Sequence, residues 1–295
     1  MRTMVFVAGL GHSGSTLLDI MLGCHERFTG LGEIYLQVKP GEERWQRKHE
    51  IQCSCWETMA DCPFWGPTIQ KLRREPQATL EQRYRTVVDA FFETYGDDQI
   101  LVDSSKCYPA LKIVHQIPDL DVKVLFMLKD VRAWVCSIRD SVKLREAFTV
   151  GQLMRKFGFG VKALAAGINR TSTCLYYRWY KDNKKFQRFF QRDGVKSFQL
   201  GYEELALATP EILAQICEFL EITPDEKMLS LQDSTSHNAS GNRMRNQKAK
   251  RERIMYDNRW FYRSDWRFPS MLLGQVNRYN AREVYKNTRE GIWSK

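Results

Sequence analysis

The stretch MVFVAGLGHSGSTLLDIML, residues 4–22, constrains the fold more than any other part of the chain. It starts as an apolar, β-branched run, turns through glycine and then repeats leucine and methionine at helical spacing, so it predicts a strand, a loop and a helix. Gly9 and Gly14 are separated by four residues and precede Ser15 and Thr16, which is the spacing of a phosphate-binding loop with Ser15 in place of its lysine. The turn favours a bound anion, and the missing lysine counts against ATP or GTP hydrolysis. A glycine turn that serves only as a tight connection is the alternative.

The same strand-to-helix transition recurs along the chain. Residues 99–117 and 122–140 each begin as a buried strand and continue as a helix. Residues 196–205 indicate a further strand, and residues 209–222 a helix with Thr209 as its cap. The expected fold class is therefore α/β, with a P-loop-like parallel β-sheet flanked by helices.

The remaining segments predict insertions within one domain, residues 1–295, because the sequence shows no repeat and no low-complexity linker. Residues 37–78, rich in charge, Trp, Cys and Pro, are predicted to form an inserted cap segment, followed by a helix over Thr79–Tyr95. Apolar positions at helical steps predict a long helical segment over residues 149–192.

The charge of the 295 residues narrows the class of ligand without choosing it. Lys and Arg number 45 against 35 Asp and Glu, and the net charge of +10 suits an anionic ligand, nucleic acid or an acidic membrane surface. The densest basic run, residues 242–253, fits an anion-binding or a solvated segment equally.

No apolar run reaches the roughly 20 residues that span a bilayer, and no signal peptide is evident. Four of the eight cysteines fall within predicted helices and Cys107 just before one, the usual pattern of reduced thiols, and a cytoplasmic location is expected.

The turn resembles the 5′-phosphosulfate loop of the sulfotransferases that use 3′-phosphoadenosine 5′-phosphosulfate (PAPS). In that loop a Lys or Arg followed by Ser-Gly-Ser/Thr-Thr opens the first helix. Here His12 stands in the basic position before Ser13, Gly14, Ser15 and Thr16. The resemblance implies that these five residues hold the 5′-phosphosulfate. A histidine is cationic only part of the time near neutral pH, so His12 supplies less charge than a Lys or Arg.

A second segment, LKDVRAWVCS at residues 128–137, resembles the 3′-phosphate motif of the same family. That motif is an Arg-Asp-Pro-Arg strand end with a serine eight positions after its first basic residue. Lys129 and Ser137 stand at those two positions and Arg132 at the second arginine, while Val131 replaces the proline. A cation at the strand end and a hydroxyl about two turns into the next helix can converge on one phosphate at the carboxyl edge of a parallel sheet.

Two later segments are similar to bacterial members of the family. Residues 201–222 resemble its Tyr-Glu-Asp-Leu motif with the Pro-Glu helix behind it. Residues 236–245 resemble the late glycine loop that closes over the nucleotide, which adds Asn242 and Arg243 to the expected cofactor ligands. The resemblance implies transfer of a sulfuryl group from PAPS, released as 3′,5′-bisphosphoadenosine (PAP), to a hydroxyl or amine of a small-molecule, lipid or carbohydrate acceptor. No metal, nucleic-acid partner or membrane span is implied.

Sulfuryl transfer needs a base for the acceptor proton and cations near the transferring oxygens. Glu33, in FTGLGEIY, is the candidate base, because several sulfotransferase groups place a catalytic glutamate in a similar Gly-Glu setting. Lys106, just beyond the second predicted strand, resembles the lysine that contacts the sulfuryl group, and His12 completes the candidate catalytic set. The alternatives are that Glu33 caps a helix or pairs with an arginine, and that Lys106 is a solvated loop residue.

Two other functions fit parts of the pattern. A P-loop nucleotide or small-molecule kinase is the alternative enzyme, and Asp103 superficially resembles the acid that ends its Walker B strand. The lysine that a kinase needs in its phosphate loop is absent. A nucleic-acid-binding protein would use the basic run 242–253 and would leave two ordered phosphate motifs without a role.

Cys53, Cys55 and Cys62 are grouped within the insertion, and His49 is nearby. Thiolate and imidazole are suitable zinc ligands, but Cys-x-Cys lacks the usual two-residue gap and no second pair follows. A disulfide, or thiols packed into a Trp-rich segment, are the alternatives, and no metal is expected.

Overall fold

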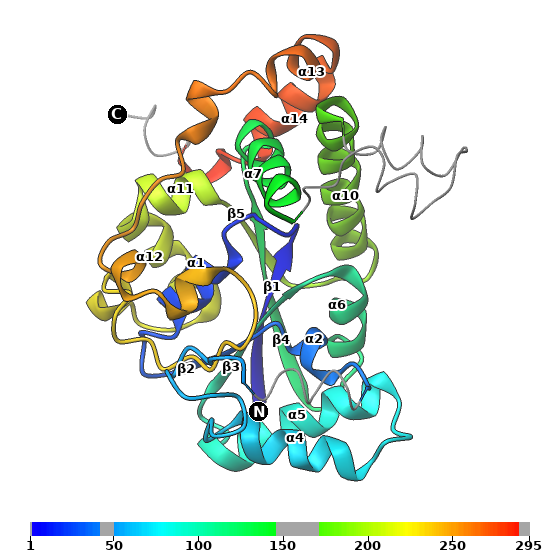
Figure 1. The fold of residues 1–295 in the computed structure, drawn as a ribbon, viewed down its shortest axis with the longest axis vertical. Helices are drawn as coiled ribbons and strands as arrows, with labels where there is room; N and C mark the ends of the chain where they lie inside the picture. Colours follow the sequence, from blue (N-terminus) through cyan, green and yellow to red (C-terminus); the bar gives the residue numbers. More distant parts are fainter. Residues whose placement is uncertain (1, 42–49, 146–170, 289–295) are drawn as a thin grey trace.

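The computed structural model describes residues 2–41, 50–145 and 171–288 and arranges them around a five-stranded sheet (Figure 1). Every strand pair is parallel, and the order across the sheet is β2-β3-β1-β4-β5. The predicted parallel α/β sheet is confirmed. The strands are β1 (Arg2–Gly9), β2 (Phe28–Gly32), β3 (Ile100–Lys106), β4 (Leu120–Leu128) and β5 (Ser197–Gly201).

The central strand β1 divides the hydrophobic core into two parts. Met4, Phe6 and Ala8 belong to one buried cluster, and Val5 and Val7 belong to the other. Successive side chains of a strand point to opposite faces of the sheet, so a strand that is apolar at every position requires cover on both faces.

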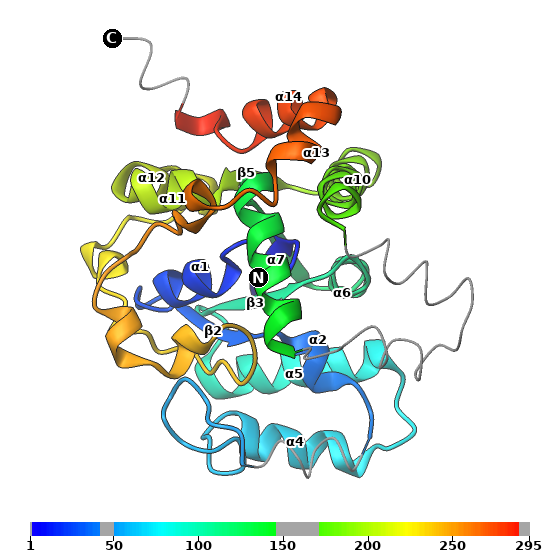
Figure 2. The same ribbon diagram turned by 45° about the horizontal axis from the view of Figure 1, so that its top comes forward.

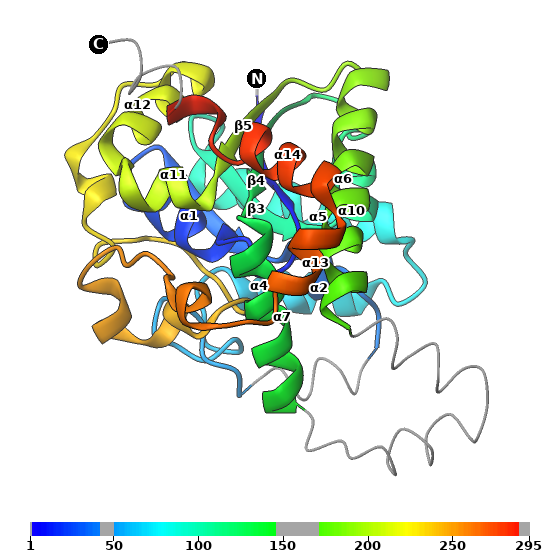
Figure 3. The same ribbon diagram turned by 90° about the horizontal axis from the view of Figure 1, so that it is seen from above.

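Helices provide that cover on both faces (Figure 3). The Val5 face carries α1 (Ser15–Leu22), α11 (Tyr202–Leu207) and α12 (Thr209–Leu220). The Met4 face carries α5 (Leu80–Tyr95), α6 (Tyr108–Val114) and α10 (Ser172–Arg192). None of the described helices is long and apolar enough to cross a membrane. The other described α-helices are α2 (Ile34–Val38), α4 (Trp65–Arg74), α7 (Val131–Arg145), α13 (Arg267–Leu272) and α14 (Gly274–Glu283).

The edge strand β2 was not predicted from the sequence. Its five residues, FTGLG, include two glycines, which weaken a strand and give it no alternating pattern. A Cβ at Gly30 would lie 2.3 Å from a carboxylate oxygen of Asp19 on α1. Glycine is therefore needed where α1 packs closely on β2.

The described part of the insertion packs against residues 235–238, which cover the open edge of β2. Its helix α4 packs on the outer side of α5 (Figure 2), and its loop contacts residues 236–238. The backbone N–H of His237 donates to the carbonyl of Gly30 (2.5 Å), and the N–H of Ser54 donates to the carbonyl of Asn238 (3.1 Å). An uncovered edge strand would leave unpaired backbone groups, so the segment around His237, with the insertion packed behind it, protects the sheet at this edge.

Helix boundaries agree with most of the sequence predictions. The helix predicted over Thr79–Tyr95 is α5, which begins one residue later with Thr79 as its N-cap: the Thr79 hydroxyl accepts from the N–H of Gln82 (3.2 Å), and the Gln82 side chain accepts from the N–H of Thr79 (2.8 Å). The later part of the predicted helical segment 149–192 is α10, whereas residues 149–170 lie outside the described residues.

The predicted cap of α12 was wrong by one residue. Ala208 is the N-cap, and Thr209 is the first residue of the helix. The Thr209 hydroxyl donates back to the carbonyl of Leu205 (2.7 Å), because α11 ends directly before α12 and offers that acceptor.

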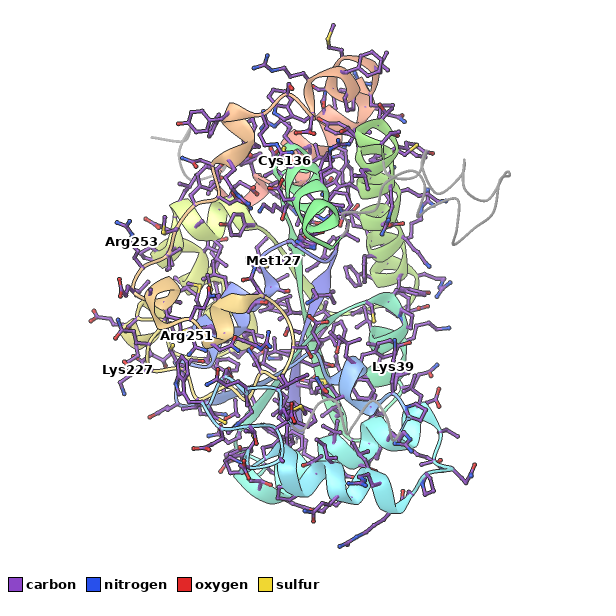
Figure 4. All side chains as sticks on the ribbon, in the orientation of Figure 1. Lys39, Met127, Cys136, Lys227, Arg251 and Arg253 are labelled. Carbon is purple, nitrogen blue, oxygen red and sulfur yellow. The ribbon has the colours of Figure 1, made fainter. Side chains whose placement is uncertain are left out.

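The basic run 242–253 folds against α1. Its first turn, η2 (Arg243–Asn246), contacts α1, and Arg251, in the next turn, is only 3% exposed (Figure 4). The Arg251 guanidinium donates to the carbonyls of Met244 (3.2 Å) and Arg245. Part of this positive charge therefore holds the segment together.

Candidate active site

The turn between β1 and α1, residues 10–14 and here named the anion loop, is shaped by its glycine. Gly14 has φ of 93°, and a Cβ there would lie 2.5 Å from the ring of Tyr202, so no other residue fits without displacement. The N–H of Leu17 donates to the Gly14 carbonyl (2.9 Å) as α1 begins. The Ser13 hydroxyl is buried without a hydrogen-bond partner among the described residues. A glycine turn at a helix N-terminus, with a buried hydroxyl beside it, suits an anion.

His12 links the anion loop to α7. Its φ of 70° lies in the left-handed region that residues other than glycine rarely adopt. Its Nδ1 lies 3.2 Å from the hydroxyl of Ser137, and the indole of Trp134 donates to the carbonyl of Gly11 (2.8 Å). The two segments that the sequence assigned to opposite ends of a nucleotide therefore touch each other.

Lys129, at the end of β4, is paired with an acid. Its Nζ donates to Asp257 Oδ2 (2.8 Å) and lies 4.6 Å from the ring centre of Tyr202. Arg259 also binds Asp257, through Nε (2.7 Å) and Nη2 (2.9 Å). Burial raises the pKa of Asp257, but the hydrogen bonds from Arg259 and the charge of Lys129 outweigh it and hold that pKa well below its usual range. The lysine that the sequence assigns to the 3′-phosphate, Lys129, is thus already paired with the carboxylate of Asp257.

Arg132 braces the start of α7. It forms a two-pronged pair with Asp130 (2.6 and 2.8 Å) and lies 4.0 Å from the ring centre of Trp260. Asp130 is fully buried and also accepts from Asn280 (2.9 Å). Its backbone N–H donates to Glu203 (2.9 Å), whose pKa is raised to about 8 by burial and by the charge of Asp130. The motif after β4 contains the acid Asp130, and the motif after β5 contains the acid Glu203. The hydrogen bond between these two residues joins the ends of the two strands.

Glu33 and Lys106 form an ion pair where β2 and β3 end. Lys106 Nζ donates to Glu33 Oε1 at 2.6 Å, and the two side chains are 16% (Glu33) and 14% (Lys106) exposed. Glu33 occupies the N-cap position of α2 without a side-chain cap, so its partner is this lysine instead of a helix end or an arginine. Lys106 has φ of 66°, a second left-handed non-glycine residue at the site. The pair leaves the carboxylate largely enclosed by the protein.

A buried network beneath this pair fixes the start of α2. Asp103 is fully buried and accepts from the hydroxyls of Tyr84 (2.5 Å) and Ser105 (2.5 Å). The Ser105 hydroxyl accepts from the N–H of Tyr35, two residues after Glu33 (2.9 Å). Burial raises the pKa of Asp103 to about 6. Asp103 thus has a positioning role inside the core.

The late glycine loop lies between the anion loop and Glu33. The N–H of Asn242 donates to the hydroxyl of Thr16 (3.2 Å). A Cβ at Gly241, whose φ is 108°, would lie 3.0 Å from the Thr16 hydroxyl and 3.6 Å from Glu33 Oε1. The side chain of Arg243 lies outside the described residues. The late loop, the first helix and the candidate base therefore converge.

The predicted site residues of the strand ends are thus gathered at the carboxyl ends of β1, β2, β3 and β4, where parallel sheets bind ligands. They form three groups: the histidine–serine contact, the glutamate–lysine pair with the late loop, and the lysine held by an acid. Ser15, the first residue of α1, is buried beside the anion loop. The three groups are His12 with Ser137, Glu33 and Lys106 with Thr16 and Asn242, and Lys129 with Asp257.

Two surface depressions, of about 410 and 500 Å³, lie elsewhere. The first is lined by Arg2 and Leu120, which begin β1 and β4, and the second by residues 75–86. Neither is near the carboxyl ends of the strands, so neither is a candidate acceptor site.

Comparison with known proteins identifies the family. Residues 4–226 match a family model described as the sulfotransferase family. The chain belongs to the sulfotransferase family. It is an enzyme of sulfuryl transfer, in agreement with a phosphate-type loop that lacks the ATPase lysine. No curated protein matches the chain.

Solved sulfotransferase domains share the fold of this sulfotransferase. The domain from the Synechococcus PCC 7002 olefin synthase has 17% identity and a TM-score of 0.53, over 94% of this chain and 95% of that one. The domain from the curacin biosynthetic pathway has 16% identity and a TM-score of 0.52, over 93% of this chain and 98% of that one. At these identities the likeness concerns the fold alone.

Proposed function

We propose that this sulfotransferase moves the sulfuryl group of PAPS to a hydroxyl or amine of a small-molecule, lipid or carbohydrate acceptor, with Glu33 as the base. The observation that carries the proposal is the 2.6 Å pair of Glu33 and Lys106, next to Thr16 and Gly241 where the anion loop enters α1. A carboxylate that accepts a proton and an ammonium that faces negative oxygens are the groups that this transfer requires.

In this mechanism the acceptor atom forms a bond to sulfur while the bond from sulfur to the 5′-phosphate oxygen breaks, and PAP leaves. Glu33 accepts the proton of the acceptor, and Lys106 balances charge on the sulfuryl oxygens. The N–H groups of the anion loop, with the side chains of His12, Ser13 and Ser15, hold the 5′-phosphosulfate. Lys129, Ser137, Asn242 and Arg243 hold the rest of the nucleotide.

Two observations count against the kinase alternative. Ser15 stands where a kinase needs its lysine, and Asp103, the Walker B-like acid, is fully buried and engaged by Tyr84 and Ser105. An acid in that position is not free to hold Mg²⁺.

The proposal keeps three further predictions from the sequence: a single domain over residues 1–295, a cytoplasmic location and no nucleic-acid partner. None of the eight cysteines, all of which lie in the described part of the chain, forms a disulfide, which supports a reducing compartment. The buried, internally bonded Arg251 supports a structural role for part of the basic run.

PAP is expected to raise the melting temperature of the protein much more than AMP or ATP at equal concentration. A ligand at about 100 times its Kd stabilises by about 2.7 kcal/mol, and only PAP offers a 3′-phosphate to Lys129 and Ser137. Thermal denaturation with each nucleotide measures the difference. Equal shifts from PAP and AMP would refute the 3′-phosphate assignment.

The affinity for PAPS is expected to fall with rising pH if His12 holds the 5′-sulfate as an imidazolium, because the neutral imidazole carries no charge to attract it. In His12→Arg this pH dependence should flatten, since arginine stays charged. Calorimetric titration across the pH range tests both proteins. If the variant keeps the same profile, His12 acts only as a neutral donor.

Transfer from radiolabelled PAPS to pooled hydroxylated and amine acceptors tests the function directly. Label that moves from PAPS to an acceptor, without ATP, supports the proposal. Transfer of phosphate from ATP, with no use of PAPS, would establish the kinase alternative instead.

A further inference from the structure

Three cysteines of the insertion meet a histidine from the far end of the chain. One ligand atom each from Cys53, Cys55, Cys62 and His237 lies within 4.8 Å of the other three. Cys53, Cys62 and His237 are buried, and Cys55 is partly exposed. We propose that these four residues, here named the cysteine cluster, bind one zinc ion. The proposal stands apart from the proposed function, since it uses none of the residues assigned to sulfuryl transfer.

The distances within the cluster fit a shared metal better than a disulfide. The sulfurs of Cys53 and Cys62 are 3.8 Å apart, and the Cys62 sulfur is 3.3 Å from His237 Nδ1. In a tetrahedral site with Zn–S bonds of about 2.3 Å, neighbouring sulfurs stand about 3.8 Å apart. A disulfide requires about 2.05 Å.

A backbone N–H points at one of the three sulfurs. The N–H of Trp65 donates to the Cys62 sulfur (3.4 Å). The chain between the first two cysteines closes a tight turn, in which the N–H of Trp56 donates to the carbonyl of Cys53 (3.1 Å). N–H donors aimed at sulfur stabilise thiolates, which are the form that binds a metal.

The imidazole is held in place by its surroundings. Its ring lies 6.3 Å from the ring centre of Phe64 and 6.2 Å from that of Tyr95. The carbonyl of His237 accepts from the indole of Trp65 (2.6 Å), and its N–H donates to Gly30 (2.5 Å). Fixed rings and fixed backbone orient a ligand before the metal arrives.

Three thiolates and one imidazole select zinc over hard cations such as Mg²⁺ or Ca²⁺. Four protein ligands leave no open position, so the site is structural. Three thiolates on Zn²⁺ leave a net charge of −1, and Arg245 lies within electrostatic reach of both Cys53 and Glu33. Its Nε is buried with no hydrogen-bond partner in the described chain, so a negative group nearby would offset its burial.

The metal would join two distant segments next to the candidate active site. Residues 53–62 supply three ligands, and His237 lies on the segment that continues to Gly241 and Asn242. Gln37, on α2, donates to the hydroxyl of Ser240 in that segment (2.6 Å). Zinc at the cluster would therefore hold the late glycine loop against the first helix and Glu33.

Zinc at this cluster departs from the sequence-based expectation that no metal is bound. The short Cys-x-Cys spacing pointed away from zinc, and the nearby candidate His49 lies outside the described residues. The fourth ligand is 175 residues from Cys62 in sequence, which no local spacing rule can detect.

The metal content of the full-length protein, purified without chelator, tests the proposal. Elemental analysis should find about one zinc ion per chain, and replacement by Co²⁺ should give the absorption bands of tetrahedral thiolate coordination. In Cys53→Ser and Cys62→Ser the zinc content should fall about tenfold or more. Cys174→Ser, a partly exposed cysteine on α10, is the matched control and should keep its zinc.

A second pair of variants separates loss of a ligand from loss of the fold. His237→Cys should retain zinc, because a cysteine sulfur reaches nearly the same point as Nδ1, whereas His237→Ala should lose it and melt at a lower temperature. The proposal is overturned if the folded parent protein takes up neither zinc nor Co²⁺, or if mass spectrometry finds a disulfide between Cys53 and Cys62 in the native protein. It is also overturned if His237→Ala retains zinc as the parent does.

Discussion

Glu33→Gln is expected to lower the single-turnover rate of sulfuryl transfer by about 10² to 10⁴ while the affinity for PAP changes little. Glutamine keeps the size of glutamate, and its side-chain oxygen can still accept the hydrogen bond from Lys106 Nζ. The contact that spans 2.6 Å in the parent protein is therefore kept. It cannot accept the proton of the acceptor at neutral pH. Rapid-quench transfer from PAPS and calorimetric titration with PAP, on the same variant, measure the two quantities.

The matched control for this experiment is Glu93→Gln. Glu93 is an exposed glutamate on α5 that also pairs with a lysine, Lys71, at 2.5 Å. Its replacement removes one acid and one ion pair away from the site, and the transfer rate should not change. If folded, PAP-binding Glu33→Gln transfers as fast as the parent, Glu33 is not the base. Loss of PAP affinity together with activity would mean that the Glu33–Lys106 pair only supports the structure.

The fold could be predicted from local pattern because its central elements are locally consistent. The strand β1, which is apolar from Met4 to Ala8, the glycine turn and the periodic helix α1 each carry their own signal, and the same signal repeats for β3 and β4. β2 carries none, since FTGLG is a strand through its pairing with β3 and the close packing of α1. β2 forms because of these tertiary contacts, and its own five residues do not reveal it as a strand.

The candidate site could be predicted residue by residue but without its pairings. Glu33 and Lys106 were each proposed from their own motif, yet their contact joins positions 73 residues apart. Asp257 was missed because a lone acid beside a basic run has no spacing signature. Its role follows only from Lys129 and Arg259, which surround it in space.

The pairing of Lys129 with Asp257 also changes the expectation for cofactor binding. The Lys129 side chain is only 6% exposed, and its charge is already met by a carboxylate at 2.8 Å. A 3′-phosphate that binds Lys129 must therefore compete with Asp257 or share the cation with it. The backbone N–H of Asp257 is held by the hydroxyl of Tyr202 (3.1 Å), so the acid is presented by an ordered segment.

Lys129→Ala is expected to weaken PAP binding by about 10- to 100-fold, the usual value of hydrogen bonds to a charged group, and to change AMP binding little. Asp257→Asn is expected to act in the opposite direction and to tighten PAP about tenfold, because it removes the competing charge from Lys129 and from Arg259. Calorimetric titration of both variants with PAP and with AMP makes the comparison, and the exposed Lys227→Ala is the control for loss of a lysine.

The contrast between the two nucleotides carries the conclusion, since general damage to the site would weaken both. If Lys129→Ala binds PAP as the parent does, or if Asp257→Asn weakens PAP as Lys129→Ala should, the ion pair is part of the scaffold and the 3′-phosphate is held by other residues.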